Sequence, residues 1–400
     1  MPEKLILERL QQLLHSAQLE NIKLAFQLAE GQHISKKVLL APWESLSFII
    51  YKSTLEDLSP DQLARILGTT QFTLTNYIYK TYKTTVAQFH HLPQLQKLYI
   101  RASEMQKLPL SITKVKQLQE LFLMRTSIKK LPKSISQLEN LQKFSLNHNQ
   151  LKTLPSSLSN LAQLKELYLQ SNQFKQFPKS IMGLQELQRL DLSNNQIKSI
   201  PRSISQLQQL KFLNVTQNQI SSIPVSLKEL HQLQDLHFSN NQLKKLGKNI
   251  TTIKSLIRLD LSNNQLKEIP SHIEQLANLT TLHLNNNQLS ELPQELFNNS
   301  RLYHLELAGN NLDHLPQEFS QLSQMYSLIL SRNNFKTLPL PILELSGLRY
   351  LNLRGNLLTD LPERITTCLK LRDIMLQGTG ISKARIEDLR AKMPWCTITS

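Results

Sequence analysis

Glycine and cysteine are scarce in this sequence, with nine and two residues among 400. Nucleotide-binding loops depend on glycines that let the backbone approach a phosphate, and the sequence contains neither GxxxxGK[ST] nor GxGxxG. An extracellular chain of this length usually has more cysteines than Cys368 and Cys396, paired as disulfides. These shortages argue against a nucleotide-binding protein and against a secreted one.

Long hydrophobic runs are also missing. Residues 1–14 contain four charged side chains, and they lack the apolar run and the small-residue cleavage site of a signal peptide. The sequence holds no stretch of about 18 apolar residues that would span a bilayer. We therefore expect a soluble cytoplasmic protein without a transmembrane segment.

The net charge of +16 is unevenly distributed along the chain. Residues 1–90 carry a net charge of +1, residues 91–270 carry +15, and residues 271–400 are neutral. Because like charges on one surface attract an oppositely charged partner, this excess favours an acidic protein, RNA or an anionic membrane as a partner.

A repeat of the form LxxLxLxxNxLxxLPxxIxxLxx fills most of the chain, and successive copies begin 23 residues apart without a slip. The copies begin at Leu95, Leu118, Leu141, Leu164, Leu187, Leu210, Leu233, Leu256, Leu279, Leu302, Met325, Leu348 and Leu371. Thirteen copies in one register, the last truncated, predict a solenoid in which each coil stacks on the next.

Each position of the repeat predicts a structural role. Apolar residues at the fourth and sixth positions, such as Leu190 and Leu192, alternate with polar ones and predict a short strand with one buried face. The asparagine at the ninth position predicts a buried amide that hydrogen-bonds the backbone of neighbouring coils. Proline at the fifteenth position, replaced by Gly247 in one copy, predicts an extended return segment.

This repeat resembles that of the intracellular leucine-rich-repeat family with 23-residue coils, which includes Ras-suppressor and Scribble-type proteins and bacterial relatives. The resemblance covers residues 95–400, although Ser103, Thr126 and Thr379 replace the asparagine in the terminal copies. It implies an α/β solenoid of the leucine-rich-repeat horseshoe type, with a parallel β-sheet on the concave face. It also implies a scaffold or adaptor that binds a protein on that face, in a role such as intracellular signalling, and a bacterial source.

We expect three domains. Residues 1–94 form an N-terminal helical capping domain, with two amphipathic helices before Gly31 and a second helical group from Trp43 to Tyr82. Residues 95–381 form the solenoid. Residues 382–400 form a C-terminal cap with a helix that begins after Ser382 and ends at Pro394.

Residues 59–80 also fit a helix-turn-helix. Such motifs place a small residue in the first helix, glycine at the turn and an aliphatic residue beyond it, and Ala64, Gly68 and Leu74 occupy these positions. Against this, residues 1–90 have almost no net charge, whereas phosphate contacts dominate DNA affinity. A nucleic-acid-associated protein that uses this segment and the basic repeats is therefore the alternative function.

The third, fifth, seventh and eighth positions of each copy should face solvent on the concave side, and three zones stand out there. The first zone is aromatic and consists of Tyr99, Arg101, Phe122, Met124 and Tyr168. Aromatic residues with arginine are typical of interface hot spots. The alternative is that the N-terminal helices cover this zone, because the end coils of a solenoid need a cap.

The second zone alternates histidine with carboxylate, and it consists of Asp191, His237, Asp260, His283 and Glu306, with Asp235 and His304 beside them. Two imidazoles and carboxylates on adjacent strands suggest Zn²⁺, but ligands on flat strands seldom converge tetrahedrally. We therefore expect a solvated polar ladder without a metal. Since carboxylates favour the protonated imidazole, these histidines also suggest partner binding that changes between about pH 6 and 8.

The third zone is a smaller cluster of Arg332, Tyr350 and Arg354, with Ile329 and Met375 beside them. A basic flank lies outside the strands, at the twelfth and sixteenth positions, and consists of Lys129, Lys152, Lys175, Lys179, Lys198, Arg202, Lys244, Lys248 and Lys267. Such charges usually serve solubility, but they also suit an acidic partner.

The sequence gives no sign of catalysis. It has no nucleophile elbow, and Cys368 occupies a core position of its repeat. We therefore expect a non-enzymatic adaptor without a cofactor, and leave its partner and its oligomeric state open.

Overall fold

A computed structural model of the chain describes residues 3–32, 34–43, 59–75, 89–101 and 104–400. The chain divides into two compact units. The first comprises Met1–Phe174 and Pro178–Leu187, and the second comprises Lys175–Phe177 and Gln188–Ser400. Each unit is described by itself below.

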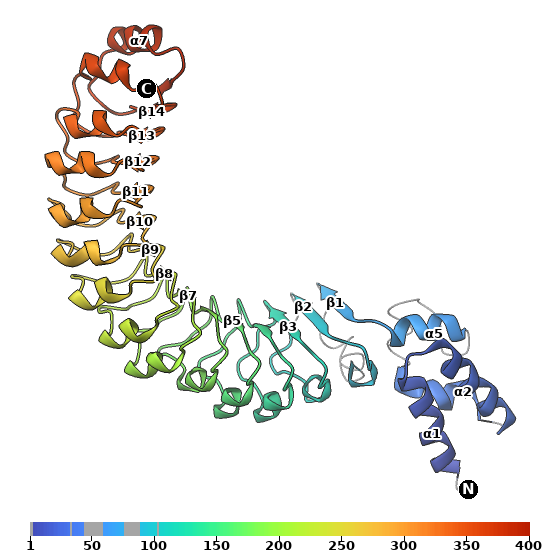
Figure 1. The fold of residues 1–400 in the computed structure, drawn as a ribbon. Helices are drawn as coiled ribbons and strands as arrows, with labels where there is room; N and C mark the ends of the chain where they lie inside the picture. The colour runs from blue at the N-terminus through green and yellow to red at the C-terminus, as the bar shows by residue number, and fades with distance from the viewer. Residues whose placement is uncertain (1–2, 33, 44–58, 76–88, 102–103) are drawn as a thin grey trace. The chain divides into compact units, whose positions relative to one another are not determined.

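The described residues form fifteen parallel strands whose order in the sheet is their order along the chain (Figure 1). The strands are β1 (Gln71–Thr75), β2 (Lys97–Arg101), β3 (Glu120–Met124), β4 (Lys143–Ser145), β5 (Glu166–Tyr168), β6 (Arg189–Asp191), β7 (Phe212–Asn214), β8 (Asp235–His237), β9 (Arg258–Asp260), β10 (Thr281–His283), β11 (His304–Glu306), β12 (Ser327–Ile329), β13 (Tyr350–Asn352), β14 (Asp373–Met375) and β15 (Thr397–Thr399). Each repeat contributes one strand, β2 to β14, so the predicted solenoid with a parallel sheet is confirmed.

Leucines at the fourth and sixth repeat positions form the core behind the sheet. In β6, Leu190 and the following Leu192 are fully buried, whereas Asp191 between them is only half-buried. The register pairs Leu190 with Leu213 of the next strand, so equivalent leucines stack from coil to coil. Each buried leucine contributes about 1.5–3 kcal/mol through removal of apolar surface from water.

The return segments are short 3₁₀ helices. They are η4 (Ile112–Lys114), η5 (Lys133–Gln137), η6 (Ser156–Asn160), η7 (Lys179–Gly183), η8 (Arg202–Gln206), η9 (Val225–Glu229), η10 (Lys248–Thr252), η11 (Ser271–Gln275), η12 (Gln294–Asn298), η13 (Gln317–Gln321), η14 (Leu340–Glu344) and η15 (Glu363–Thr367). From η5 onward the fifteenth-position residue precedes each helix in an extended conformation, as Pro201 does with φ −72° and ψ 154°. The predicted role of the proline is thus confirmed, and Gly247 adopts the same conformation (φ −70°, ψ 152°).

The ninth-position asparagines form the predicted buried ladder. Asn241 Nδ2 donates hydrogen bonds to the carbonyl oxygens of Val215 (2.9 Å) and Phe238 (3.0 Å), one in the preceding coil and one in its own. Its Oδ1 accepts a hydrogen bond of 2.9 Å from the backbone N–H of Ile220. One amide therefore satisfies three backbone groups that lie away from water, which explains why asparagine recurs here.

The eighth repeat position has a left-handed backbone, a feature that the sequence reading missed. The residues with positive φ at this position are Arg125, His148, Ser171, Asn194, Gln217, Asn240, Asn263, Asn286, Gly309, Arg332, Gly355 and Gly378. Asparagine and glycine tolerate this conformation best, because the asparagine side chain hydrogen-bonds the local backbone and glycine lacks a Cβ atom. Their frequency at this position therefore reflects backbone geometry.

The N-terminal helices are α1 (Glu3–His15), α2 (Leu19–Gly31), α3 (Lys36–Leu40) and α5 (Pro60–Leu67), with short 3₁₀ turns η1 (Ala41–Trp43) and η3 (Phe89–His91). Helix α1 packs against α2, and α2 packs against α5. The buried residues Leu14 and Ile22 lie in this core. The two amphipathic helices predicted before Gly31 are confirmed. Most of the second helical group predicted from Trp43 to Tyr82 lies outside the described residues.

The helix-turn-helix prediction is wrong at residues 71–75. Helix α5 begins as predicted, with a capping box between Ser59 and Gln62. However, residues 71–75 form strand β1, which pairs in parallel with β2. Phe72 and Leu74 alternate with polar residues and are buried, so the segment follows the period of a strand and extends the sheet by one member. A recognition helix therefore does not begin at this segment.

The C-terminal helix α7 (Lys383–Lys392) lies where the sequence predicted it. The Ser382 side chain caps it by accepting a hydrogen bond from the backbone N–H of Arg385. Strand β15, which pairs with β14, was missed because only three residues alternate there. Ile398 of β15 is buried against the last coil.

Replacing Asn241 with alanine should lower the free energy of unfolding by about 2–4 kcal/mol, because the buried N–H of Ile220 loses its acceptor and the carbonyls of Val215 and Phe238 each lose one of two asparagine donors. Urea unfolding of the full chain measures this. Gln242→Ala, at the exposed neighbouring position, is the matched control and should leave the midpoint unchanged. Equal effects of the two substitutions would contradict the role assigned to the ladder.

The strand assignment of β1 predicts a contrast between adjacent residues. Leu74→Asp should lower the unfolding midpoint strongly, because it buries a charge in an apolar core. Thr73→Asp, on the exposed face of the strand, should have little effect. If Thr73→Asp were as damaging as Leu74→Asp, β1 would not be a strand with one buried face.

Candidate functional site

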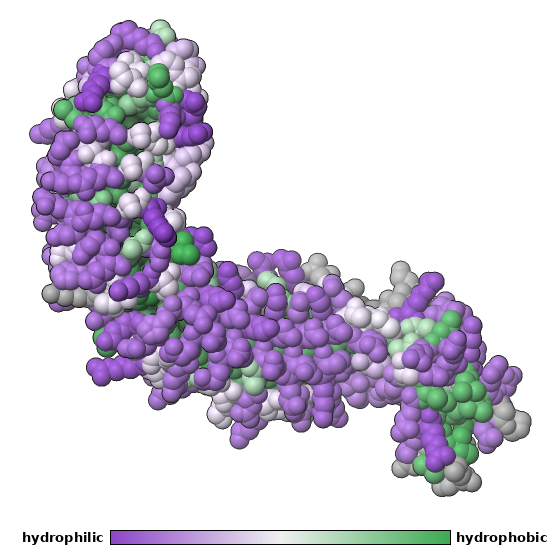
Figure 2. Space-filling model, viewed as in Figure 1, coloured by the Kyte–Doolittle hydropathy of each residue, from purple (hydrophilic) through white to green (hydrophobic). Residues whose placement is uncertain are grey.

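The candidate site is the exposed side of the parallel sheet, called the sheet face here. It consists of the side chains at the third, fifth and seventh repeat positions, most of which are half-buried. In the view of Figure 2, hydrophilic side chains dominate the surface of the repeats.

The aromatic cluster comprises Tyr99, Phe122 and Tyr168, all in the first unit. The rings of Tyr99 and Phe122 are stacked, with centroids 4.7 Å apart and planes inclined by 15°. The Tyr99 hydroxyl donates a hydrogen bond of 2.7 Å to Glu120, and the Tyr168 hydroxyl donates one of 2.7 Å to Glu166. The rings are therefore held in place before any partner binds. Met124 lies half-buried beside them, and Arg101 is exposed.

A ladder of ion pairs at the third repeat position supports these rings. Lys97 pairs with Glu120 at 3.0 Å, and Lys143 pairs with Glu166 at 3.0 Å. Burial would raise the pKa of Glu120, but the hydrogen bonds from Tyr99 and Lys97 outweigh it and lower the pKa. Burial and the bond to Glu120 raise the pKa of Tyr99 to about 12, so this phenol keeps its proton. The sequence reading named Tyr350 from this third-position column, but not the alternating charges of Lys97, Glu120, Lys143 and Glu166.

Asp191 and Asp260 have a structural role in the second zone. Asp191 Oδ1 accepts a hydrogen bond of 2.9 Å from the backbone N–H of Ser193, and Asp260 Oδ1 accepts one of 3.0 Å from that of Ser262. Asn214 makes the same contact with Thr216 at 3.0 Å. Asp or Asn at the fifth position therefore closes the turn that follows the strand.

His237 lies in a stack of side chains on β6, β7 and β8. The guanidinium carbon of Arg189 lies 3.7 Å from the ring centroid of Phe212, and the Phe212 and His237 rings are 5.2 Å apart. Burial lowers the pKa of His237 more than Asp260 and Asp235 raise it. The predicted tighter proton binding is therefore wrong for His237, because loss of hydration outweighs the neighbouring carboxylates.

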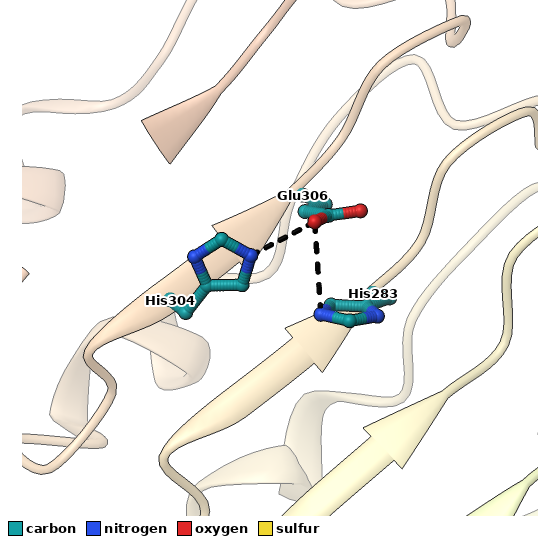
Figure 3. Close-up of side chains that lie close together, drawn as sticks. All are labelled: His283, His304 and Glu306. Atoms are coloured by element: carbon teal, nitrogen blue, oxygen red, sulfur yellow. Dashed lines mark hydrogen bonds and ion pairs between the residues drawn. The ribbon is translucent and has the colours of Figure 1, made fainter. Parts of the chain in front are cut away.

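Three side chains of the second zone converge: His283 from β10, and His304 and Glu306 from β11 (Figure 3). His304 Nε2 lies 2.8 Å from Glu306 Oε1, and His283 Nε2 lies 3.7 Å from the same oxygen. The hydrogen bond from His304 and the charge of His283 lower the pKa of Glu306 against the effect of burial. The sequence predicted a polar ladder with mutual hydrogen bonds, but not the convergence of these three side chains.

The third zone contains more aromatic side chains than the sequence reading recognised. Tyr350 is 40% exposed, and Arg332 and Arg354 are exposed. The ring centroids of Tyr326 and Tyr350 are 5.2 Å apart. The Tyr326 ring also stacks on the Tyr303 ring, with centroids 4.7 Å apart. Tyr303 and Tyr326 occupy the second repeat position, which the reading of the strand columns did not include.

The basic flank is exposed wherever the structure describes its side chains. The exposed members are Lys129, Lys152, Lys175, Lys179, Lys198, Arg202, Lys244 and Lys267. The side chain of Lys248 lies outside the described residues. None of these described side chains forms an ion pair with a described carboxylate, so their charge is available to solvent or to a partner.

A hydrophobic groove lies between helices α1 and α2, lined by Ile6, Leu10, Leu13 and Leu28. Figure 2 shows hydrophobic side chains gathered over these helices, and Leu28 is 45% exposed. The sequence predicted two amphipathic helices here, but not a groove between them. None of the helices described here has the length and apolar character needed to cross a bilayer.

Family models for leucine-rich repeats match much of the solenoid. A leucine-rich repeat region model matches residues 155–248, a leucine rich repeat model matches residues 116–174 and 277–335, and a two-copy leucine rich repeat model matches residues 254–298. A search of curated protein sequences gives no significant match.

Solved structures give the same result. A leucine-rich-repeat protein of Leptospira interrogans is 33% identical, with a TM-score of 0.80 over 86% of this chain and 92% of that one. An internalin of Listeria monocytogenes shares the fold at 20% identity, with a TM-score of 0.68 over 84% and 94% of the two chains. The Arabidopsis receptor kinase HAESA, in complex with the peptide hormone IDA and a co-receptor, is 25% identical, with a TM-score of 0.59 over 73% of this chain and 51% of that one. The chain therefore belongs to the leucine-rich-repeat proteins.

Proposed function

We propose that this protein is a non-enzymatic adaptor that binds a protein or peptide partner on its sheet face. The observation that carries the proposal is the aromatic cluster. Tyr99 and Phe122 expose stacked rings, and hydrogen bonds to Glu120 and Glu166 fix both tyrosines. Rigid aromatic groups with a polar rim are typical of interface hot spots, since they lose little conformational entropy on binding.

The family gives the proposal further support. Leucine-rich-repeat domains typically bind proteins or peptides on the inner face of the sheet, and the similar HAESA receptor is in complex with a peptide hormone. An anchor in the aromatic cluster and specificity from the polar groups of β6–β11 agree with this mode of binding. Fold similarity alone does not identify the partner, because repeat surfaces diverge while cores persist.

A bacterial source and a cytoplasmic location are part of the proposal. The similarity to the Leptospira protein supports the source. Cys368 and Cys396 are both free thiols, and burial raises the pKa of each, that of Cys396 to about 11. Such thiols are packing groups and suit a reducing compartment.

The alternative function, association with nucleic acid, now depends on the basic flank alone, because β1 replaces the start of the expected recognition helix. An exposed lysine column binds acidic proteins and phosphate backbones by the same attraction, which weakens with salt. Nuclease treatment separates the two partners.

The first test is a pull-down from source lysate, treated with nuclease, at about physiological salt, where exposed charges are partly screened. The Tyr99→Ala, Phe122→Ala, Tyr168→Ala triple variant should lose the bound protein, with affinity reduced at least about thirtyfold, because each hot-spot residue contributes about 2 kcal/mol or more. The retained proteins are identified by mass spectrometry, and the affinity is then measured with the purified partner.

Two control variants make the result specific. Leu110→Ala removes a side chain that is 61% exposed but lies outside the strands, and it should bind normally. The Tyr99→Phe, Tyr168→Phe variant keeps the rings and should retain most of the affinity. If the triple variant binds as well as the wild type, the sheet-face proposal is wrong. Loss of all retained material on nuclease treatment would instead support the nucleic-acid alternative.

A further inference from the structure

His283, His304 and Glu306 lie among the polar groups of β6–β11, and partner binding does not require their convergence at one point. Adjacent parallel strands bring the three together, because β10 pairs His283 with Glu306 of β11, and His304 is two residues before Glu306 on the same face. One ligand atom from each lies within 4.8 Å of the others. All three side chains are partly buried, with exposures of 31%, 27% and 19%. The cluster is therefore held by sheet register and is only partly open to water.

The geometry is close to that of a metal site. Zn²⁺ binds histidine nitrogen and carboxylate oxygen at about 2.0–2.2 Å, which places tetrahedral ligand atoms about 3.3 Å apart. The two measured distances to Glu306 Oε1, 2.8 Å from His304 Nε2 and 3.7 Å from His283 Nε2, lie on either side of this value. The ligand atoms of His283 and His304 lie within 4.8 Å of each other.

A second observation concerns His283 itself. Its Nε2 atom is buried and makes no hydrogen bond to any described residue, and the 3.7 Å distance to Glu306 is too long for one. A buried polar atom without a partner is costly, and such atoms mark places where an ion or a ligand completes the bonding. In this cluster the unsatisfied nitrogen points toward a carboxylate and a second imidazole (Figure 3).

We propose that His283, His304 and Glu306 bind a divalent transition-metal ion, Zn²⁺ in the first instance. Two imidazoles and one carboxylate are a donor set suited to Zn²⁺, whereas Ca²⁺ and Mg²⁺ prefer oxygen ligands alone. On binding, the metal replaces the hydrogen bond between His304 and Glu306, and His304 then binds it through an unprotonated Nε2 with the ring proton on Nδ1. Three protein ligands leave one coordination position on the sheet face for water.

Asn285 is the positioning residue of this site. Its side-chain amide donates a hydrogen bond to Oε2 of Glu306, which leaves Oε1 directed at the two histidines. Outer-shell partners of this kind fix the orientation of a ligand, and their loss typically weakens metal affinity by about 10- to 100-fold. Asn285 also accepts a hydrogen bond of 2.8 Å from the backbone N–H of Ala308, which anchors it between the two coils.

The proposal is tested by isothermal titration of the metal-free full chain with ZnCl₂. We expect one saturable site per chain. Zn²⁺ affinity should fall at least about tenfold in each of the variants His283→Ala, His304→Ala and Glu306→Gln, because each variant removes a metal ligand. Asn285→Ala should lower the affinity by about 10-fold although all three ligands remain. Ca²⁺ and Mg²⁺ should not compete. Co²⁺ bound in place of Zn²⁺ should show the visible absorption of a tetrahedral nitrogen and oxygen site, which His283→Ala abolishes.

Two control variants separate this site from other histidines. His237→Ala removes an imidazole from the same sheet face, and His91→Ala alters a cluster in which the His90 and His91 rings lie 3.9 Å apart. Both should bind Zn²⁺ as the wild type does. Circular dichroism checks that each variant is folded. The proposal is overturned if the wild type shows no saturable Zn²⁺ binding, or if His283→Ala and Glu306→Gln bind with unchanged affinity.

Discussion

A coil of 23 residues cannot bury its own leucines, and this constraint determines the rest of the structure. Each coil must cover the apolar side of the next, so the backbone groups of every turn lie between two coils and away from water. The ninth-position asparagine meets this need, as Asn241 does by bonding Val215, Phe238 and Ile220. The amide fixes both the shape of its own turn and the register with the neighbouring coil. Because the register is fixed, a side chain at a given repeat position always has the same neighbours on the adjoining strands.

The sheet face follows from that regular register. Side chains of one column lie beside each other on neighbouring strands, so the chemistry of a zone depends on what successive repeats place at one position. Asp191 and Asp260 close their own turns through Ser193 and Ser262. The same column supplies Tyr99 and Phe122, whose rings stack, and His283 and Glu306, which face each other. A single column therefore contains both structural groups and the groups best suited to bind a partner or a metal.

The repeat made most of the fold predictable from sequence, because Leu190, Asn241 and Pro201 each occupy a position with one structural role. The ends were harder to predict, since they lack the repeat. Residues 71–75 fitted a helix-turn-helix by spacing, yet Phe72 and Leu74 face the core of a strand. The local sequence pattern does not show that the edge of a sheet is available for pairing. Here the pairing of β1 with β2 decides that residues 71–75 form a strand.

The candidate site was only partly predictable, for a different reason. The repeat positions show which residues are neighbours on adjacent strands, but not which rotamers their side chains adopt. The hydrogen bond from Tyr99 to Glu120 and the convergence of His283, His304 and Glu306 depend on side-chain geometry. The effect of burial on His237 likewise depends on packing, with the Phe212 ring beside it, and this burial lowers the pKa although Asp260 and Asp235 act to raise it.

The most direct test of the central claim is photo-crosslinking in cells with a photoreactive amino acid in place of Phe122, compared with the same amino acid in place of Leu110. Phe122 lies on the sheet face, whereas Leu110 is exposed outside the strands. Binding on the sheet face predicts a discrete crosslinked protein from position 122 and none from position 110. Crosslinks from position 110 without any from position 122 would contradict the account.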